Sequence, residues 1–148
     1  MSTGLANATA TRLTDGSVLV VGGSNNGVDN TTAKFFNPTT GLFESVNGGL
    51  TVSRTNHAAP LMGDGRVAMI GGESGDNFVR GSVEVYDAVS RTFSTLGRLS
   101  AARRRPTASV ILNGPNVGRI LVFGGGAEDK VGAAAEIVHP SPFPRIRK

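Results

Sequence analysis

An internal repeat, with a period of about 50 residues, constrains this chain more than any other feature. Three Gly-Gly pairs each end a short apolar run, at Gly22-Gly23, Gly71-Gly72 and Gly124-Gly125. The intervals between them are 49 and 53 residues, and the longer one contains the extra segment PNVG at 115–118. Units repeated at such a period bury their apolar faces by stacking on one another. The sequence therefore predicts a stack of similar units.

Two aromatic positions, a leucine and an arginine recur in the same frame as the glycines. Separated by 49 or 50 residues, the matched pairs are Phe36 and Tyr86, Phe43 and Phe93, Leu50 and Leu99, and Arg54 and Arg103. We divide the single repeat region, 1–148, into unit one at 6–49, unit two at 50–98 and unit three at 99–140. A basic, proline-containing tail follows at 141–148.

Each unit predicts short antiparallel strands and no helix. We expect strand one at 7–13, 56–62 and 106–112, strand two at 17–22, 66–71 and 119–124, strand three at 32–37, 82–87 and 133–138, and strand four at 41–46 and 91–96 only. Asp-Gly or Asn-Gly joins strands one and two, which predicts type I′ hairpins with positive φ at both central residues. Strand two is apolar on both faces and needs cover on both sides.

These motifs resemble the kelch repeat family. The resemblance rests on a Gly-Gly pair after an apolar strand, an aromatic about 13 to 14 residues later and a second aromatic one turn beyond, as in Gly71-Gly72, Tyr86 and Phe93. The segments EVYDAVSRTF and FFNPTTGLF are most similar to repeats of the galactose-oxidase-like group. The resemblance implies an all-β, kelch-type β-propeller segment with four-stranded antiparallel blades. Two blades would be complete, and the third would lack its fourth strand.

The sequence also departs from the family pattern. Phe43 and Phe93 stand where the family often has tryptophan, and Val138 stands at the tyrosine position of unit three. Kelch propellers usually have six or seven blades, so the resemblance implies a fragment, a truncated product or part of an assembly. Two copies that complete one propeller as a homodimer would cover the apolar faces of the end blades.

Charge is divided unevenly along the chain. Residues 1–97 carry six basic and eight acidic side chains, whereas residues 98–148 carry nine basic and three acidic ones. Cysteine is absent, which excludes disulfides and thiolate sites. No run approaches the ~20 apolar residues of a membrane helix, and the first residues lack the pattern of a signal peptide. We therefore expect no membrane segment and, by default, a cytoplasmic protein.

Arginines beside the loops that follow the Gly-Gly pairs are the main binding candidates. Those loops, 24–31, 73–81 and 126–132, are expected on one face, together with the segment Arg103-Arg104-Arg105. Arg103 and its equivalent Arg54 are binding candidates for which a scaffold role is the favoured interpretation. Arg104 and Arg105 lack such equivalents, and we expect them to form a positive patch with Arg98. A solvated basic surface is the alternative.

Polar residues of the longest loop are weaker candidates. Ser74, Asp76 and Asn77 could bind a ligand, although loops are commonly polar without binding anything. A metal site formed by Asp29 with 128–129 has no fixed ligand spacing to support it. His57, at the start of strand one, is expected to pack or form a hydrogen bond at the blade edge.

Two functions of different class follow from these residues. The first, which we favour, is a binding module that presents its loop face to a protein or a glycan. The second is part of a kelch-propeller carbohydrate-active enzyme, of the galactose-oxidase-like or sugar-epimerase type. The copper and tyrosine–cysteine cofactor of the galactose-oxidase-like group needs a cysteine, which this chain lacks, so we expect no cofactor. The arginines are not interleaved with aromatics, which argues against nucleic-acid binding.

Overall fold

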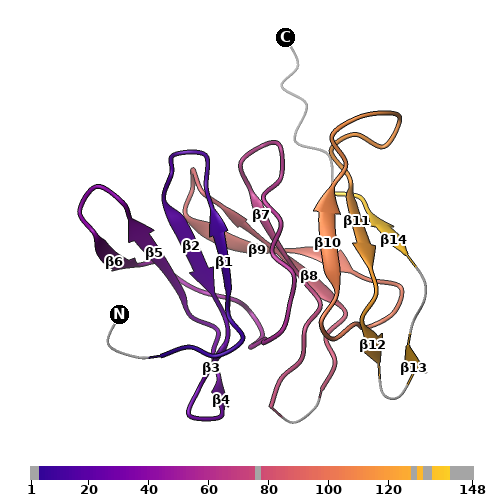
Figure 1. Cartoon of the computed structure of the whole chain (residues 1–148), viewed down its shortest axis with the longest axis horizontal. Coiled ribbons are helices and arrows are strands. Elements are labelled where there is room, and N and C mark those ends of the chain that lie inside the picture. Colours follow the sequence, from indigo (N-terminus) through magenta and orange to yellow (C-terminus); the bar gives the residue numbers. More distant parts are fainter. Residues whose placement is uncertain (1–3, 76–77, 128–129, 132–134, 141–148) are drawn as a thin grey trace.

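The chain folds into antiparallel β-sheets that follow one another in sequence order. A computed structural model describes residues 4–75, 78–127, 130–131 and 135–140. Three main sheets stand side by side, with long turns at one end and small hairpins at the other (Figure 1). Throughout the described part the regular structure is strand, without helix. A membrane-spanning helix is accordingly not found there.

Sheet one matches the predicted four-stranded order. Its strands are β1 (Thr9–Arg12), β2 (Val18–Val21), β5 (Ala33–Asn37) and β6 (Leu42–Ser45), hydrogen-bonded in the order β1-β2-β5-β6. The aromatics Phe36 and Phe43 are directly opposite on β5 and β6, with ring centroids 5.2 Å apart. Such cross-strand pairs help to hold the register of a sheet.

Sheet two has three strands where four were predicted. They are β7 (Val67–Ile70), β8 (Ser82–Asp87) and β9 (Thr92–Arg98). The predicted strand one at 56–62 is wrong as a continuous strand, because it forms only isolated bridges from Ala58 to Ile70 and from Leu61 to Val67. Pro60 lies between these bridges and has no N–H to donate to the ladder.

Sheet three contains β10 (Thr107–Val110), β11 (Ile120–Phe123) and β14 (Glu136–Val138). A fourth strand would follow β14, where the described residues end, so its predicted absence stays a prediction. The tail at 141–148 lies outside them.

Two small hairpins were missed by the sequence analysis. Strands β3 (Ser24–Asn25) and β4 (Val28–Asp29) form one, and β12 (Gly126–Ala127) and β13 (Lys130–Val131) form the other. Both follow a Gly-Gly pair, and both project from the same end of the molecule (Figure 1). Two-residue strands are too short to show the alternating pattern from which strands are predicted.

The turns between strands one and two are not of the predicted type I′. Gly16 has a φ of 86°, whereas Asp15 is not among the residues with positive φ. The N–H of Gly16 donates to Leu13 O, and the N–H of Leu13 donates to Ser17 O. This is a three-residue loop with glycine in the left-handed position, the other common hairpin solution. The equivalent Gly65, with a φ of 84°, repeats the arrangement in unit two.

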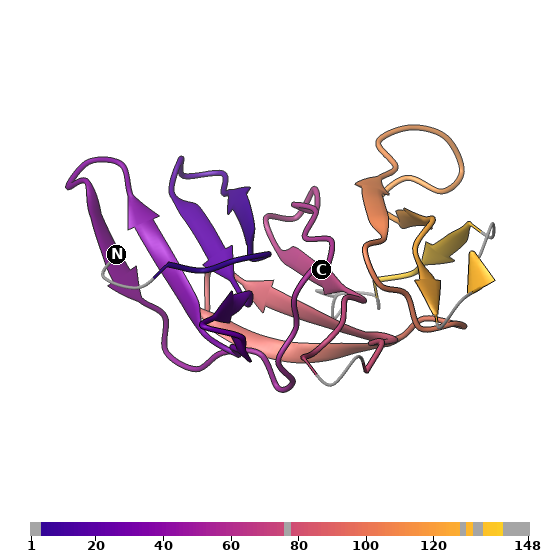
Figure 2. The ribbon, with the colours of Figure 1, turned by 60° about the horizontal axis from the view of Figure 1, so that its bottom comes forward.

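Two apolar layers join the three sheets. The first lies between sheets one and two and includes Leu19, Val21, Phe35, Val67, Met69 and Tyr86. The second lies between sheets two and three and includes Ala68, Ile70, Val83, Val85, Ile120 and Val122. Strand β7 therefore buries both faces, which confirms the requirement inferred from its continuous apolar run. The sheets fan out around these layers (Figure 2).

Candidate functional site

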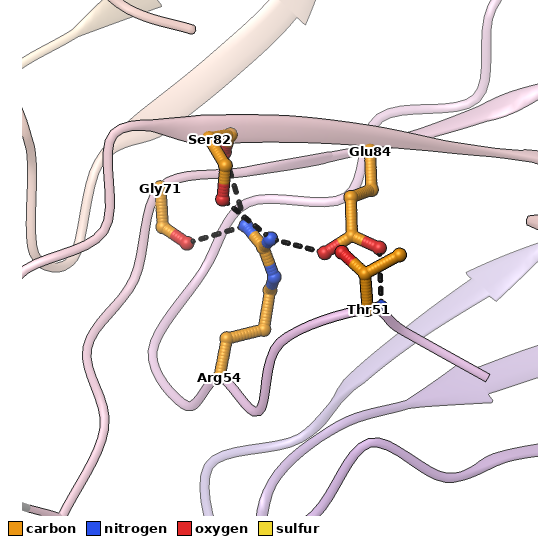
Figure 3. Close-up of polar contacts among 5 residues, drawn as sticks. All are labelled: Thr51, Arg54, Gly71, Ser82 and Glu84. Atoms are coloured by element: carbon orange, nitrogen blue, oxygen red, sulfur yellow. Dashed lines mark hydrogen bonds and ion pairs between the residues drawn. The ribbon is translucent and has the colours of Figure 1, made fainter. Parts of the chain in front are cut away.

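Arg54 lies at the centre of a buried polar network within unit two (Figure 3). Its Nη1 donates to Gly71 O at 2.9 Å and to Ser82 O at 3.1 Å. Its Nη2 donates to Ser82 Oγ at 2.9 Å and to Glu84 Oε1 at 2.5 Å. The other oxygen of Glu84 accepts a 2.6 Å bond from the N–H of Thr51. The network ties the segment that enters unit two to strand β8.

Burial sets the electrostatics of this network. The side chains of Arg54 and Glu84 are both completely inaccessible to solvent. Burial lowers the pKa of Arg54, and the Glu84 carboxylate opposes that shift. A buried ion pair contributes less to stability than its Coulomb energy suggests, but removing one partner leaves an uncompensated charge. Arg54 and Glu84 therefore depend on each other.

Arg103 repeats part of this arrangement one unit later. Its Nη1 donates to Gly124 O at 2.8 Å, as Arg54 donates to Gly71 O. Its own carbonyl accepts from the N–H of Gly72, at 2.8 Å, in the way that the carbonyl of Arg54 accepts from Gly23. Both arginines are buried. A scaffold role, connecting each unit to the one before it, accounts for the contacts of both.

Arg104 and Arg105 lie on what we call the loop face, formed by β3–β4, β12–β13 and the described segments 6–7, 55–56, 73–75, 78–80 and 104–105. Their two guanidinium groups converge on one carboxylate, that of Glu73. Arg104 Nε lies 3.6 Å from Glu73 Oε2, and Arg105 Nε lies 3.7 Å from Glu73 Oε1. Glu73 Oε1 also accepts a 2.8 Å hydrogen bond from Asn56. The side chain of Arg105 remains 74% exposed.

Arg105 has structural equivalents that the sequence analysis overlooked. Asn7, Asn56 and Arg105, spaced by 49 residues, have φ values of 56°, 52° and 52°. The N–H of Asn56 donates to Asn7 O, and the N–H of Arg105 donates to Asn56 O, at 3.1 and 3.0 Å. Asparagine tolerates this left-handed conformation far better than arginine. The asparagines, 49 residues apart, were the signal that could have predicted the geometry of Arg105.

The other predicted loop residues have different outcomes. Ser74 is buried, and its Oγ accepts a 3.0 Å hydrogen bond from Arg80 Nη2. Asp76 and Asn77 lie outside the described residues. Arg98 is the last residue of β9. It lines a hollow together with Leu96 and residues 136–139. The predicted positive patch of Arg98 with Arg104 and Arg105 stays a prediction.

The guanidinium of Arg80 also lies over the ring of Phe78, 4.8 Å from its centroid. Phe78 is more than half exposed, and Ser74 donates its N–H to Phe78 O. An aromatic ring with a cation above it therefore lies on the same loop as Glu73. Sequence analysis did not single out either residue, because a lone exposed aromatic in a loop has no distinguishing pattern.

His57 packs between units one and two. Its Nε2 lies 2.7 Å from Thr9 Oγ1, and the ring is buried. Burial, aided by the nearby charge of Arg54, lowers the pKa of His57 to about 3. The ring is therefore neutral at physiological pH, in agreement with the packing role expected from the sequence.

Titratable side chains do not gather into a metal centre in the described part of the chain, where no group of three or more suitable ligands is found. Asp29 has a buried Oδ2 without a hydrogen-bond partner. The residues at 128–129, which were considered with it, lie outside the described residues. No protein-family model and no curated protein matches this chain.

Proposed function

We propose that this chain is a kelch-type repeat module that binds an acidic protein or glycan through its loop face. Support for the kelch assignment comes from the period of the repeat and from the antiparallel order of sheet one. Further support comes from the repeated bond from an arginine to the first glycine of the pair, made by Arg54 and by Arg103. These features support a stack of like units and do not bear on the ligand.

The main support for the binding proposal is that Arg104 and Arg105 both lie close to the single carboxylate of Glu73. One carboxylate neutralises one guanidinium, so among these three described residues the two arginines leave one positive charge uncompensated by Glu73. Both contacts are longer than 3.5 Å, and the guanidinium of Arg105 is largely exposed. Arginine binds carboxylates and sulfates by paired, planar hydrogen bonds. A second anionic group, supplied by a ligand, would complete the pairing.

The loop that contains Glu73 also presents an apolar surface. Phe78 presents an exposed ring on the segment that begins with Glu73. An aromatic surface next to arginines suits a ligand with apolar and anionic parts, such as an acidic peptide or a glycan with acidic sugars. Loops supported by a rigid sheet scaffold are common places for binding. No observation on the described residues favours the enzyme hypothesis, which stays a prediction.

Removal of the two loop arginines tests the proposal. The variant Arg104→Gln/Arg105→Asn keeps a residue at 105 that tolerates positive φ while removing both charges. Arg12→Gln is the matched control, because Arg12 is exposed and lies at the turn end of β1. The probes are a polyglutamate peptide and an array of sulfated and carboxylated glycans, with binding measured at several salt concentrations.

We expect the wild-type chain and Arg12→Gln to bind at least one of these probes. The double variant should bind at least about tenfold more weakly and with a shallower salt dependence, because fewer ionic contacts are made. Equal binding by the double variant and the control would contradict the proposed site. A wild-type chain that binds none of the probes would contradict the proposed function.

A further inference from the structure

Sheet three exposes an apolar face, whereas the equivalent faces of sheets one and two are each covered by the next sheet. We call it the end face and define it by Leu121, Phe123 and Ile137, which are 37%, 55% and 37% exposed. Leu121 and Ile137 are opposite one another on β11 and β14. The end face is therefore a continuous surface of one sheet, formed by large apolar side chains.

Equivalent positions in sheets one and two are buried by the next sheet. In sheet one, Leu19, Val21 and Phe35 are only 1%, 1% and 9% exposed, because sheet two packs on them. The register is the same, since Leu19 is opposite Phe35 as Leu121 is opposite Ile137. In sheet two the equivalent residues are Ala68, Ile70 and Val85, which sheet three buries.

The glycine pairs give an independent sign that a neighbour belongs on the end face. A Cβ at Gly22 would lie 2.5 Å from Arg54 O, and one at Gly71 would lie 2.6 Å from Arg103 O. In both cases the backbone of the following unit fills the space. Gly124 has the same left-handed conformation, with a φ of 68°, yet a Cβ there would meet no atom of the described residues within 4 Å. The space that a following unit fills twice is thus not filled at Gly124 by any residue that the structure describes.

Sheet one carries the complementary surface at the other end of the chain. We call it the start face and define it by Val18, Val20 and Phe36, which are partly exposed. In sheet two the equivalent positions are Val67, Met69 and Tyr86, which are completely buried against sheet one. The chain thus contains at its two ends the two halves of an interface that it forms twice internally.

We propose that the end face binds the start face of a second copy of this chain. The internal junctions supply the geometry, because Tyr86 packs edge-on against Phe35 with ring centroids 5.8 Å apart. By equivalence, Phe36 of one copy contacts Ile137 of the other. Large exposed apolar patches commonly mark such interfaces. Two copies that bind head to tail at both ends form a closed dimer with two-fold symmetry, the commonest arrangement of soluble oligomers.

The first experiment measures the oligomeric state of the full chain by sedimentation at micromolar concentrations. Phe123→Asp and Val20→Asp place a charge on the end face and on the start face, respectively. Val89→Asp is the matched control, because Val89 is 96% exposed and lies in the turn between β8 and β9. Circular dichroism and thermal unfolding check that each variant is folded.

We expect a dimer for the wild-type chain and for the Val89 variant. Each face variant should raise the dissociation constant of the dimer by about tenfold or more, because a carboxylate would be buried against an apolar surface. A wild-type chain that remains a monomer would overturn the proposal. A dimer that the Phe123 substitution does not weaken would also overturn it.

Cross-linking tests the orientation and remains informative if a face variant fails to fold. The chain has no cysteine, so an introduced cysteine is unique. Chains with Phe36→Cys are mixed with chains with Ile137→Cys and treated with a short thiol-specific cross-linker. Cross-links between the two different chains are expected. Products that join only identical chains would indicate contacts of like faces and would overturn the head-to-tail arrangement.

Discussion

Arg54 and Arg103 occupy the same position in consecutive units, but their surroundings differ. Arg54 makes four hydrogen bonds, including one to the buried carboxylate of Glu84. Among the described residues, the side chain of Arg103 makes one, to Gly124 O, and none to Glu136, the equivalent of Glu84. A repeated residue therefore keeps its backbone contact in both units, whereas its ion pair exists in only one.

The difference lies in how the glutamate is held. In unit two, Thr51 binds one oxygen of Glu84, and the other is left for Arg54. In unit three, the N–H and the hydroxyl of Ser100 bind the two oxygens of Glu136, at 2.7 and 2.8 Å. Glu84 is also covered on both sides, whereas sheet three is covered on one side only. Stacking thus determines which equivalent residues form a buried charge pair.

The largest expected effect comes from breaking the buried pair. Arg54→Ala should lower the free energy of unfolding by about 3–5 kcal/mol, because Glu84 is left as an unpaired buried charge. Arg103→Ala should cost only about 1–2 kcal/mol, since it removes a single hydrogen bond. Urea unfolding of both variants measures the difference.

A double variant provides the control for this interpretation. Arg54→Met/Glu84→Leu removes both charges, so it should be more stable than Arg54→Ala alone. A double-mutant cycle with single substitutions at the two positions isolates the interaction between them. Equal destabilisation by Arg54→Ala and Arg103→Ala would refute the difference drawn between the two units.

Acid should weaken the junction between units one and two through His57. Burial holds the pKa of folded His57 near 3, below its ordinary value of 6.5. Between these pH values the unfolded chain therefore binds one more proton than the folded chain. The stability of the folded chain is unaffected by His57 above pH 6.5 and decreases as the pH falls below it. Between about pH 7.5 and pH 4.5 the free energy of unfolding should drop by about 3 kcal/mol.

His57→Gln, which cannot titrate, is the control for the pH dependence. Its free energy of unfolding should be nearly flat over the same range. Hydrogen bonds from Ser17 and Ser90 lower the pKa values of Asp15 and Asp87, so these carboxylates lose their contribution below this range. If the wild-type chain and the variant show parallel pH profiles, His57 is not the group responsible.

The smallest expected effect, and the only stabilising one, concerns Arg105. Arg105→Asn should raise the free energy of unfolding by up to about 1 kcal/mol, because asparagine adopts the left-handed conformation at lower cost. Arg104→Asn is the control, since Arg104 is not among the residues with positive φ. Urea midpoints compare the two variants. A gain in both, or in neither, would contradict the strain assigned to Arg105.

Local patterns predicted much of the fold. Strands two and three appear within about one residue of the expected limits in most units, because apolar runs ending in glycine depend on neighbours in the sequence. The turn at Asp15-Gly16 was predicted with the wrong type, since the dipeptide is compatible with more than one hairpin. The pattern across Pro60 predicted a strand, but its missing N–H prevents a continuous ladder.

The candidate site was predicted only in part. The location of Arg104 and Arg105 beside the loops followed from the repeat. Their shared partner, Glu73, did not, because it lies about 30 positions earlier in the chain and meets them only when two units stack. No local rule identifies such a contact.

The sequence by itself determined the repeat, the antiparallel strands and the positions where the backbone needs glycine, since these depend on short-range sterics and hydrogen bonding. The tertiary structure alone decided that the Arg54 ion pair is buried, that Arg105 is exposed, and that Phe123 is 55% exposed whereas Val21 is buried. Desolvation is the physical reason. Equivalent side chains acquire different energies according to what lies on the far side of their sheet, and no residue in the same unit specifies that.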